Sequence, residues 1–136
     1  MKRQLSLTDL VRAIQERIEY GTELKCFDVV PDNEPAPFVY VEIVSVQPAD
    51  TKTMYIKDYE AHLHIIADGG SSVPVYKHIQ AVQEAMTDDI ELPPFVRLVL
   101  QTDAGVQTIQ TEEETGEKHA VLDYIFKVAY GFKTKF

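Results

Sequence analysis

The chain has 136 residues, of which 45% are hydrophobic and 10% aromatic, enough for a packed core and too apolar for a disordered segment. Its formal net charge is −9, and residues 26–126 hold 18 acidic but only 5 basic side chains. Such a surface disfavours nucleic-acid binding through phosphate neutralisation. No apolar run approaches the roughly 20 residues that cross a bilayer, and the charged N-terminal segment lacks the apolar stretch of a signal peptide. We expect a soluble protein made in the cytoplasm, with no membrane partner.

The first predicted element is a helix over residues 8–20. Ser6 or Thr8 can cap its start, and Gly21 suits the left-handed residue that ends many helices. Its apolar side chains follow the helical period of 3.6 residues, at Leu7, Leu10, Val11, Ile14 and Ile18.

Three strands are expected next. The first, residues 24–30, ends at a segment with three prolines, residues 31–37, which excludes regular structure. The second, residues 38–46, has few polar interruptions, as in a strand that is covered on both faces or lies at an interface. Residues 47–58 are interpreted as a polar connection. The third strand, residues 59–67, alternates strictly, with one face made of Tyr59, Ala61, Leu63, Ile65 and Ala67.

A turn at residues 68–72 precedes the second predicted helix, with Ser72 as a cap and Pro74 in the first turn. Its apolar stripe consists of Val75, Ile79, Val82 and Met86. Three more strands are predicted at residues 95–102, 106–112 and 120–130, and a hairpin turn at residues 103–105 joins the first two. In the last strand, one face is expected to consist of Ala120, Leu122, Tyr124, Phe126, Val128 and Tyr130.

This order of helix, three strands, helix, three strands predicts a single α+β domain over residues 1–136. Short connections favour a mainly antiparallel, mixed-order sheet of about five to six strands, and two amphipathic helices cover it as a second layer. The strands at residues 38–46 and 95–100 carry more apolar surface than two short helices can cover. Such a surplus in a small domain indicates a protein–protein contact.

Histidines are the first candidates for chemistry. His62 and His64 lie two apart on one strand face and could reach a common metal ion, but two ligands make an incomplete site. Exposed strand positions, at the free surface or at an interface, are the simpler interpretation. His78 and His119 stand alone in the sequence, with no neighbour that indicates a catalytic relay.

Other chemical signals are weaker still. Cys26 lies in a predicted strand, which favours a small buried hydrophobic residue over a nucleophile, and as the one cysteine it has no disulfide partner within the chain. The turn at residues 68–72 lacks the Lys-Ser/Thr ending of a phosphate-binding loop. The acidic clusters at residues 88–89 and 112–114 lack the spacing of a calcium loop. We therefore expect no catalytic, cofactor-binding or metal-binding residues, no cofactor and no enzymatic activity.

Four segments carry a recognisable layout, namely DVVPDNEPAPFVYVEI at 28–43, YEAHLHIIADGGSS at 59–72, VYKHIQAVQEAM at 75–86 and AVLDYIFKVAY at 120–130. Their order resembles the tail-completion proteins of long-tailed bacteriophages, also called tail terminators or head–tail joining proteins. The resemblance implies a non-enzymatic structural protein of a phage or prophage, made in the bacterial host cytoplasm and placed in the virion at the head–tail junction. It also implies a ring, commonly a hexamer, that stops growth of the tail tube, binds the tail-tube and head connector proteins, and lets DNA pass without specific binding.

In such a ring we expect the acidic residues of turns to face the lumen, among them Asp88, Asp89, Glu112, Glu113 and Glu114. Basic residues near the termini would then contact acidic partner surfaces, namely Lys2, Arg3, Lys133 and Lys135.

Two other interpretations remain open at this point. One is a small α+β ligand-binding or regulatory domain that dimerises through its exposed sheet. The other is a metal-assisted hydrolase that uses His62, His64 and a carboxylate such as Glu60.

Overall fold

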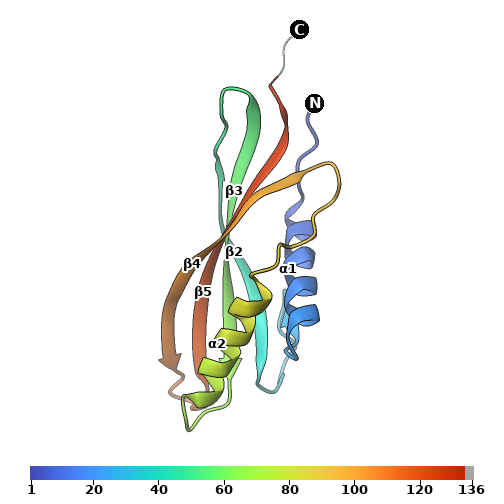
Figure 1. Ribbon diagram of the computed structural model, residues 1–136. Coiled ribbons are helices and arrows are strands. Elements are labelled where there is room, and N and C mark those ends of the chain that lie inside the picture. The colour runs from blue at the N-terminus through green and yellow to red at the C-terminus, as the bar shows by residue number, and fades with distance from the viewer. Residues whose placement is uncertain (134–136) are drawn as a thin grey trace.

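The computed structural model describes residues 1–133, which form two helices and a five-stranded sheet (Figure 1). The strand order is β1-β2-β3-β5-β4; β1 runs parallel to β2, and the other neighbours are antiparallel. The predicted α+β architecture is confirmed. In chain order the elements are α1 (Leu7–Gly21), β1 (Cys26–Phe27), β2 (Phe38–Pro48), β3 (Met54–Ala67), α2 (Val73–Ala85), β4 (Arg97–Thr111) and β5 (Lys118–Phe132).

Both helices pack on one face of the sheet, where the apolar core lies. Helix α2 lies over β3 and β5, whereas α1 packs beside it, against β1, β2 and α2. The alternation predicted for β3 is confirmed, because the side chains of its predicted apolar face are all buried. In β5, five of the six residues predicted to share one face are buried, namely Ala120, Leu122, Tyr124, Phe126 and Val128, whereas the sixth, Tyr130, is half-buried.

Helix α2 follows its predicted apolar stripe. Helix α1 departs from its stripe, because Leu7 and Val11 are not buried and Ala13 is. All four apolar residues of the predicted α2 stripe are buried. In α1 the core positions are Leu10, Ala13, Ile14 and Ile18, while Leu7 at its first turn is 47% exposed. Ser6 caps α1, since its hydroxyl accepts a hydrogen bond from the Asp9 amide. Ser72 is the N-cap residue of α2 as predicted, although its side chain makes no capping hydrogen bond.

Strand boundaries depart from the predictions at three places. The first strand has two residues rather than seven. Residues 47–58 are no simple polar connection, because Gln47 pairs with Asp58 and the β2–β3 hairpin extends as far as a turn at residues 49–53. The predicted hairpin at residues 103–105 is wrong: β4 runs through it as one strand, and Gly105, with φ of 102°, lies in an irregular stretch of the ladder to β5.

Strand β4 forms one edge of the sheet, and its outer side has no strand partner within residues 1–133. At the other edge of the sheet, β1 pairs with β2 only at Val39 and Tyr40. The rest of β2, from Val41 to Pro48, is therefore a second free edge. No helix in residues 1–133 is long and apolar enough to cross a membrane.

Candidate functional site

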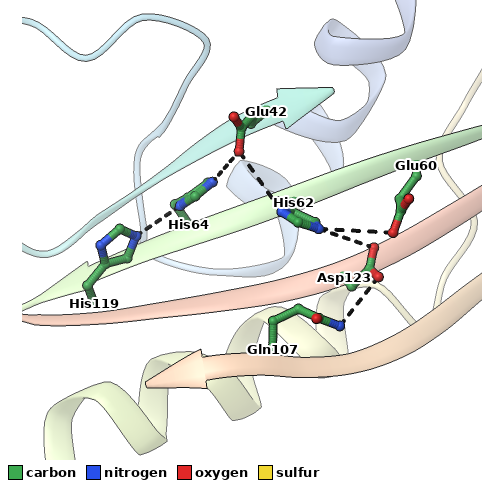
Figure 2. Close-up of polar contacts among 7 residues, drawn as sticks. All are labelled: Glu42, Glu60, His62, His64, Gln107, His119 and Asp123. Atoms are coloured by element: carbon green, nitrogen blue, oxygen red, sulfur yellow. Dashed lines mark hydrogen bonds and ion pairs between the residues drawn. The ribbon is translucent and has the colours of Figure 1, made fainter. Parts of the chain in front are cut away.

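Polar side chains form a row across the sheet face that points away from the helices (Figure 2). Strand register places them there: Glu42 of β2 lies opposite His62 of β3, and His62 lies opposite Asp123 of β5. Residues directly opposite in an antiparallel pair share one face. We call this set the polar row; its members are Glu42, Glu60, His62, His64, His119 and Asp123.

His64 connects the first half of the row. Its Nδ1 lies 2.9 Å from His119 Nε2, and its Nε2 lies 2.8 Å from Glu42 Oε1. His119 Nδ1 in turn lies 3.0 Å from Glu112 Oε1. The Tyr40 ring stacks on His64 with centroids 4.3 Å apart and planes only 3° from parallel. Two imidazoles thus join two carboxylates in one continuous chain, with one ring held by stacking.

His62 connects the second half. Its Nδ1 lies 4.0 Å from the same Glu42 Oε1, while its Nε2 faces Asp123 Oδ1 at 3.8 Å and Glu60 Oε2 at 4.0 Å. Gln107 of β4 donates a 3.4 Å hydrogen bond to the other oxygen of Asp123. The Glu42 carboxylate is therefore shared by two histidines (Figure 2).

Burial shifts the pKa values of two side chains in the polar row, His64 and Asp123. The His64 side chain is only 12% exposed, and burial lowers its pKa, an effect that the Glu42 carboxylate partly opposes. The Asp123 side chain is 10% exposed. Its burial, together with the neighbouring Glu60 carboxyl, raises the pKa of Asp123 to about 6. At both residues, burial favours the uncharged form of the side chain.

Two groups in the row place three metal-ligand atoms within 4.8 Å of one another. One is Glu42 with His62 and His64; the other is Glu60 with His62 and Asp123. The sequence pattern had suggested the histidine pair but not Glu42 or Asp123, because these come from other strands. His119 was interpreted as standing alone, and this is wrong, since it contacts His64.

The remaining sequence candidates lie elsewhere. His78 is half-buried on α2, on the helix layer rather than in the row. Cys26 is buried in the core as expected, and burial raises the pKa of its thiol to about 12, which leaves no reactive thiolate near neutrality. The turn at residues 68–72 packs against the β4–β5 turn, because a Cβ on Gly69 would lie 2.2 Å from the Gly116 carbonyl oxygen.

A second surface of interest is the β4 edge. Its exposed apolar side chains are Val99, Leu100, Val106 and Ile109, and residues 104–111 contain no charged side chain. The helices contact β1, β2, β3 and β5 but leave β4 largely uncovered. Of the apolar surplus predicted on residues 38–46 and 95–100, Val99 and Leu100 lie on this edge, whereas Val44 is the exposed large apolar residue of the first segment.

A family model described as "Putative tail termination protein" matches residues 1–136. The chain belongs to this family of tail termination proteins. Among solved structures, a chain titled "Virion of native gene transfer agent (GTA) particle" is similar, with a TM-score of 0.68 and 19% sequence identity over 90% of this chain and 96% of that chain. At this identity the likeness concerns the fold. No curated protein sequence matches the chain.

Family membership confirms the resemblance carried by the four sequence segments. It assigns the chain a structural role in the phage tail. An assembly role directs attention to surfaces that can meet other proteins, of which the β4 edge is the most apolar strand surface described above.

Proposed function

We propose that the protein forms a ring of identical subunits, a hexamer when assembled, on the end of the phage tail tube. The ring stops tube growth, joins the tube to the head connector, and lets DNA pass through its centre. Each subunit is one domain over residues 1–136, made in the bacterial cytoplasm and carried in the virion at the head–tail junction. The observation that carries this proposal is the match of a tail termination family to the full length of the chain.

The two free sheet edges support a ring. They are unlike each other, since one is the whole of β4 and the other is β2 beyond Tyr40. A contact between two different surfaces of identical subunits is heterologous and closes into a ring when the rotation permits. An unpaired strand edge also offers backbone donors and acceptors to a neighbouring chain.

The side chains of β4 also favour a contact with a neighbouring subunit. Natural proteins protect free edges with lysines, prolines or short strands, yet the second half of β4 has no such residue. Val106 and Ile109 are 41% and 45% exposed on the helix-facing side. Burying them against the next subunit would remove apolar surface from water.

The test combines purified chain with tail tubes. We expect electron microscopy to show a ring on one end of each tube, and mass measurement on the assembled ring to give a fixed multiple of the subunit mass. Tubes that keep growing in the presence of the protein would contradict the proposal. A stable dimer with no affinity for tubes would favour the ligand-binding or regulatory alternative.

The edge contact is tested with Ile109→Lys, and Tyr76→Lys serves as a matched control, because Tyr76 is a similarly exposed apolar residue on α2. Both variants should fold, as judged by circular dichroism. Only Ile109→Lys should lose ring formation, since an inward-facing charge on an edge strand blocks pairing. Equal assembly of the two variants would exclude β4 from the interface.

A further inference from the structure

We propose that Glu42, His62 and His64 form a binding site for one divalent transition-metal ion of the zinc type. The site lies on the open sheet face, and the ion would bridge β2 and β3 there. This inference is independent of the proposed ring, because all three ligands come from one subunit.

The distances suit such an ion. Glu42 Oε1 lies 2.8 Å from His64 Nε2 and 4.0 Å from His62 Nδ1, and all three ligand atoms lie within 4.8 Å of one another. Zinc bonds of about 2.0–2.2 Å in tetrahedral geometry separate neighbouring ligand atoms by roughly 3.3 Å. Glu42 is the most exposed of the three, at 54% of its side chain. Its carboxylate can therefore move to bring the ligand atoms to the separations that a zinc ion requires.

With both imidazoles neutral, one contact in the chain from Glu112 to Glu42 lacks a hydrogen atom. The chain Glu112–His119–His64–Glu42 contains three contacts, each of which needs one hydrogen atom. The carboxylates only accept, and two neutral imidazoles supply only two N–H groups. If His119 donates to Glu112 and His64 donates to His119, then His64 Nε2 faces Glu42 with a lone pair. A metal ion bound between His64 Nε2 and Glu42 Oε1 would make use of this lone pair.

His62 completes the arrangement in the same way. Its Nε2 faces the Asp123 and Glu60 carboxylates at 3.8 and 4.0 Å, which is too long for a hydrogen bond but favours the N–H at this atom electrostatically. Nδ1 then presents its lone pair toward Glu42. Metal-binding histidines usually donate their other N–H to a carboxylate or another acceptor, which fixes the tautomer and the ring orientation. His64 has that second partner in His119, and His62 has the Asp123 and Glu60 carboxylates near its other nitrogen without a hydrogen bond to either.

The alternative group of Glu60, His62 and Asp123 contains one imidazole and two carboxylates. Zinc-type ions favour imidazole nitrogen over such an oxygen-rich set. Asp123 is also held by Gln107. We therefore assign Glu60 and Asp123 to the support of His62 rather than to the ion.

The test uses the full chain without a histidine tag, freed of metal with a chelator. We expect calorimetry to show one Zn²⁺ per chain, and Co²⁺ to give the intense visible absorption of a tetrahedral site. His62→Ala and His64→Ala should each weaken Zn²⁺ binding at least 100-fold, and Glu42→Gln at least 10-fold. His78→Ala is the matched control, because His78 lies outside the row, and should bind as the wild type does.

Support from the neighbouring ring is tested with His119→Phe, which should weaken binding about 10–100-fold, as is typical when a ligand's partner is lost. Nuclear magnetic resonance on the wild type avoids any folding defect of the variants. Added Zn²⁺ should shift the ring signals of His62 and His64 and leave those of His78 in place. No saturable binding at micromolar zinc, or equal shifts of all four histidines, would overturn the assignment.

Discussion

Gly21 shows how one residue fixes the distance between the two helices. It was expected to end α1 in a left-handed conformation, but its φ is not positive and Thr22, in an extended conformation, follows as the C-cap. The reason for glycine is close packing, because a Cβ at this position would lie 2.7 Å from Ala85 Cβ of α2. The Ala85 methyl group of α2 therefore packs directly against the backbone of Gly21 in α1.

Gly21→Ala should destabilise the protein by about 1–3 kcal/mol through overpacking, although alanine normally favours a helix over glycine. Chemical denaturation measures the change in the free energy of unfolding. Ala85→Gly in the same chain should recover part of the loss, because it removes the opposing methyl group. Independent, additive effects of the two substitutions would show that the contact does not limit the packing.

Cys26 provides a test of burial at the same scale. Its pKa, raised to about 12, keeps the thiol protonated at neutral pH. Alkylation of the folded protein at pH 8 should be at least 100-fold slower than that of the protein in denaturant, as followed by mass spectrometry. Because the folded pKa lies above the unfolded one, the thiol's contribution to stability is present below pH 9 and is lost as the pH rises toward 12. Equal labelling rates would place Cys26 at the surface.

At the scale of elements, α2 connects the helix layer to the centre of the sheet. Its buried residues face β3 and β5, the two central strands. Gln101 of β4 also holds the end of this helix, since its amide donates to the Met86 carbonyl and accepts from the Ile90 amide. The hydrogen bonds of Gln101 thus fix the edge strand β4 relative to the C-terminal end of α2.

Ile79→Ala should lower the free energy of unfolding by about 2–5 kcal/mol, because it removes a buried aliphatic side chain and leaves a cavity. Tyr76→Ala on the exposed side of the same helix is the control and should change stability by less than about 0.5 kcal/mol. Thermal or chemical denaturation distinguishes them. An unchanged melting temperature for Ile79→Ala would place the stripe outside the core.

At the scale of the whole molecule, the two ends of the long axis are formed by different segments of the chain (Figure 1). The N-terminus, the described end of the chain and the β2–β3 turn lie at one end, and the acidic β4–β5 turn lies at the other. The sequence suggested that the basic residues near the termini are free to contact partner proteins. Two of them instead have contacts within the chain. Lys133 pairs with Asp50 at 3.1 Å, and Arg3 lies over the Phe95 ring at 3.9 Å. Lys135 lies outside the described residues.

If acidic turns line the ring, DNA should bind weakly, with a dissociation constant no tighter than about 10⁻⁴ M at physiological salt. Fluorescence anisotropy with duplex DNA and the assembled ring measures this. Replacing Glu112, Glu113 and Glu114 by lysine should strengthen binding and steepen its salt dependence, because each neutralised phosphate releases counterions. Micromolar affinity of the unaltered ring would contradict a lumen that leaves DNA mobile.

The sequence by itself determined the elements whose pattern is local. The stripe of α2 and the alternation of β3 and β5 each repeat over a few residues, so the period identifies both the element and its buried face. Where two structures share one local signal, the sequence did not decide between them. Asp103-Ala104-Gly105 suits a hairpin turn or an irregularity within a strand, and only pairing with β5 showed that β4 continues.

The tertiary structure decided the polar row and the free edges. Glu42, His64 and His119 come from three strands, and their contacts depend on strand register, which no single segment specifies. The same holds for the uncovered β4, because coverage depends on where the two helices pack. Side-chain periodicity acts over a few residues, whereas register and layer packing depend on interactions across the whole chain. For this reason the sequence indicated a histidine pair and an apolar surplus, and the fold supplied their neighbours and locations.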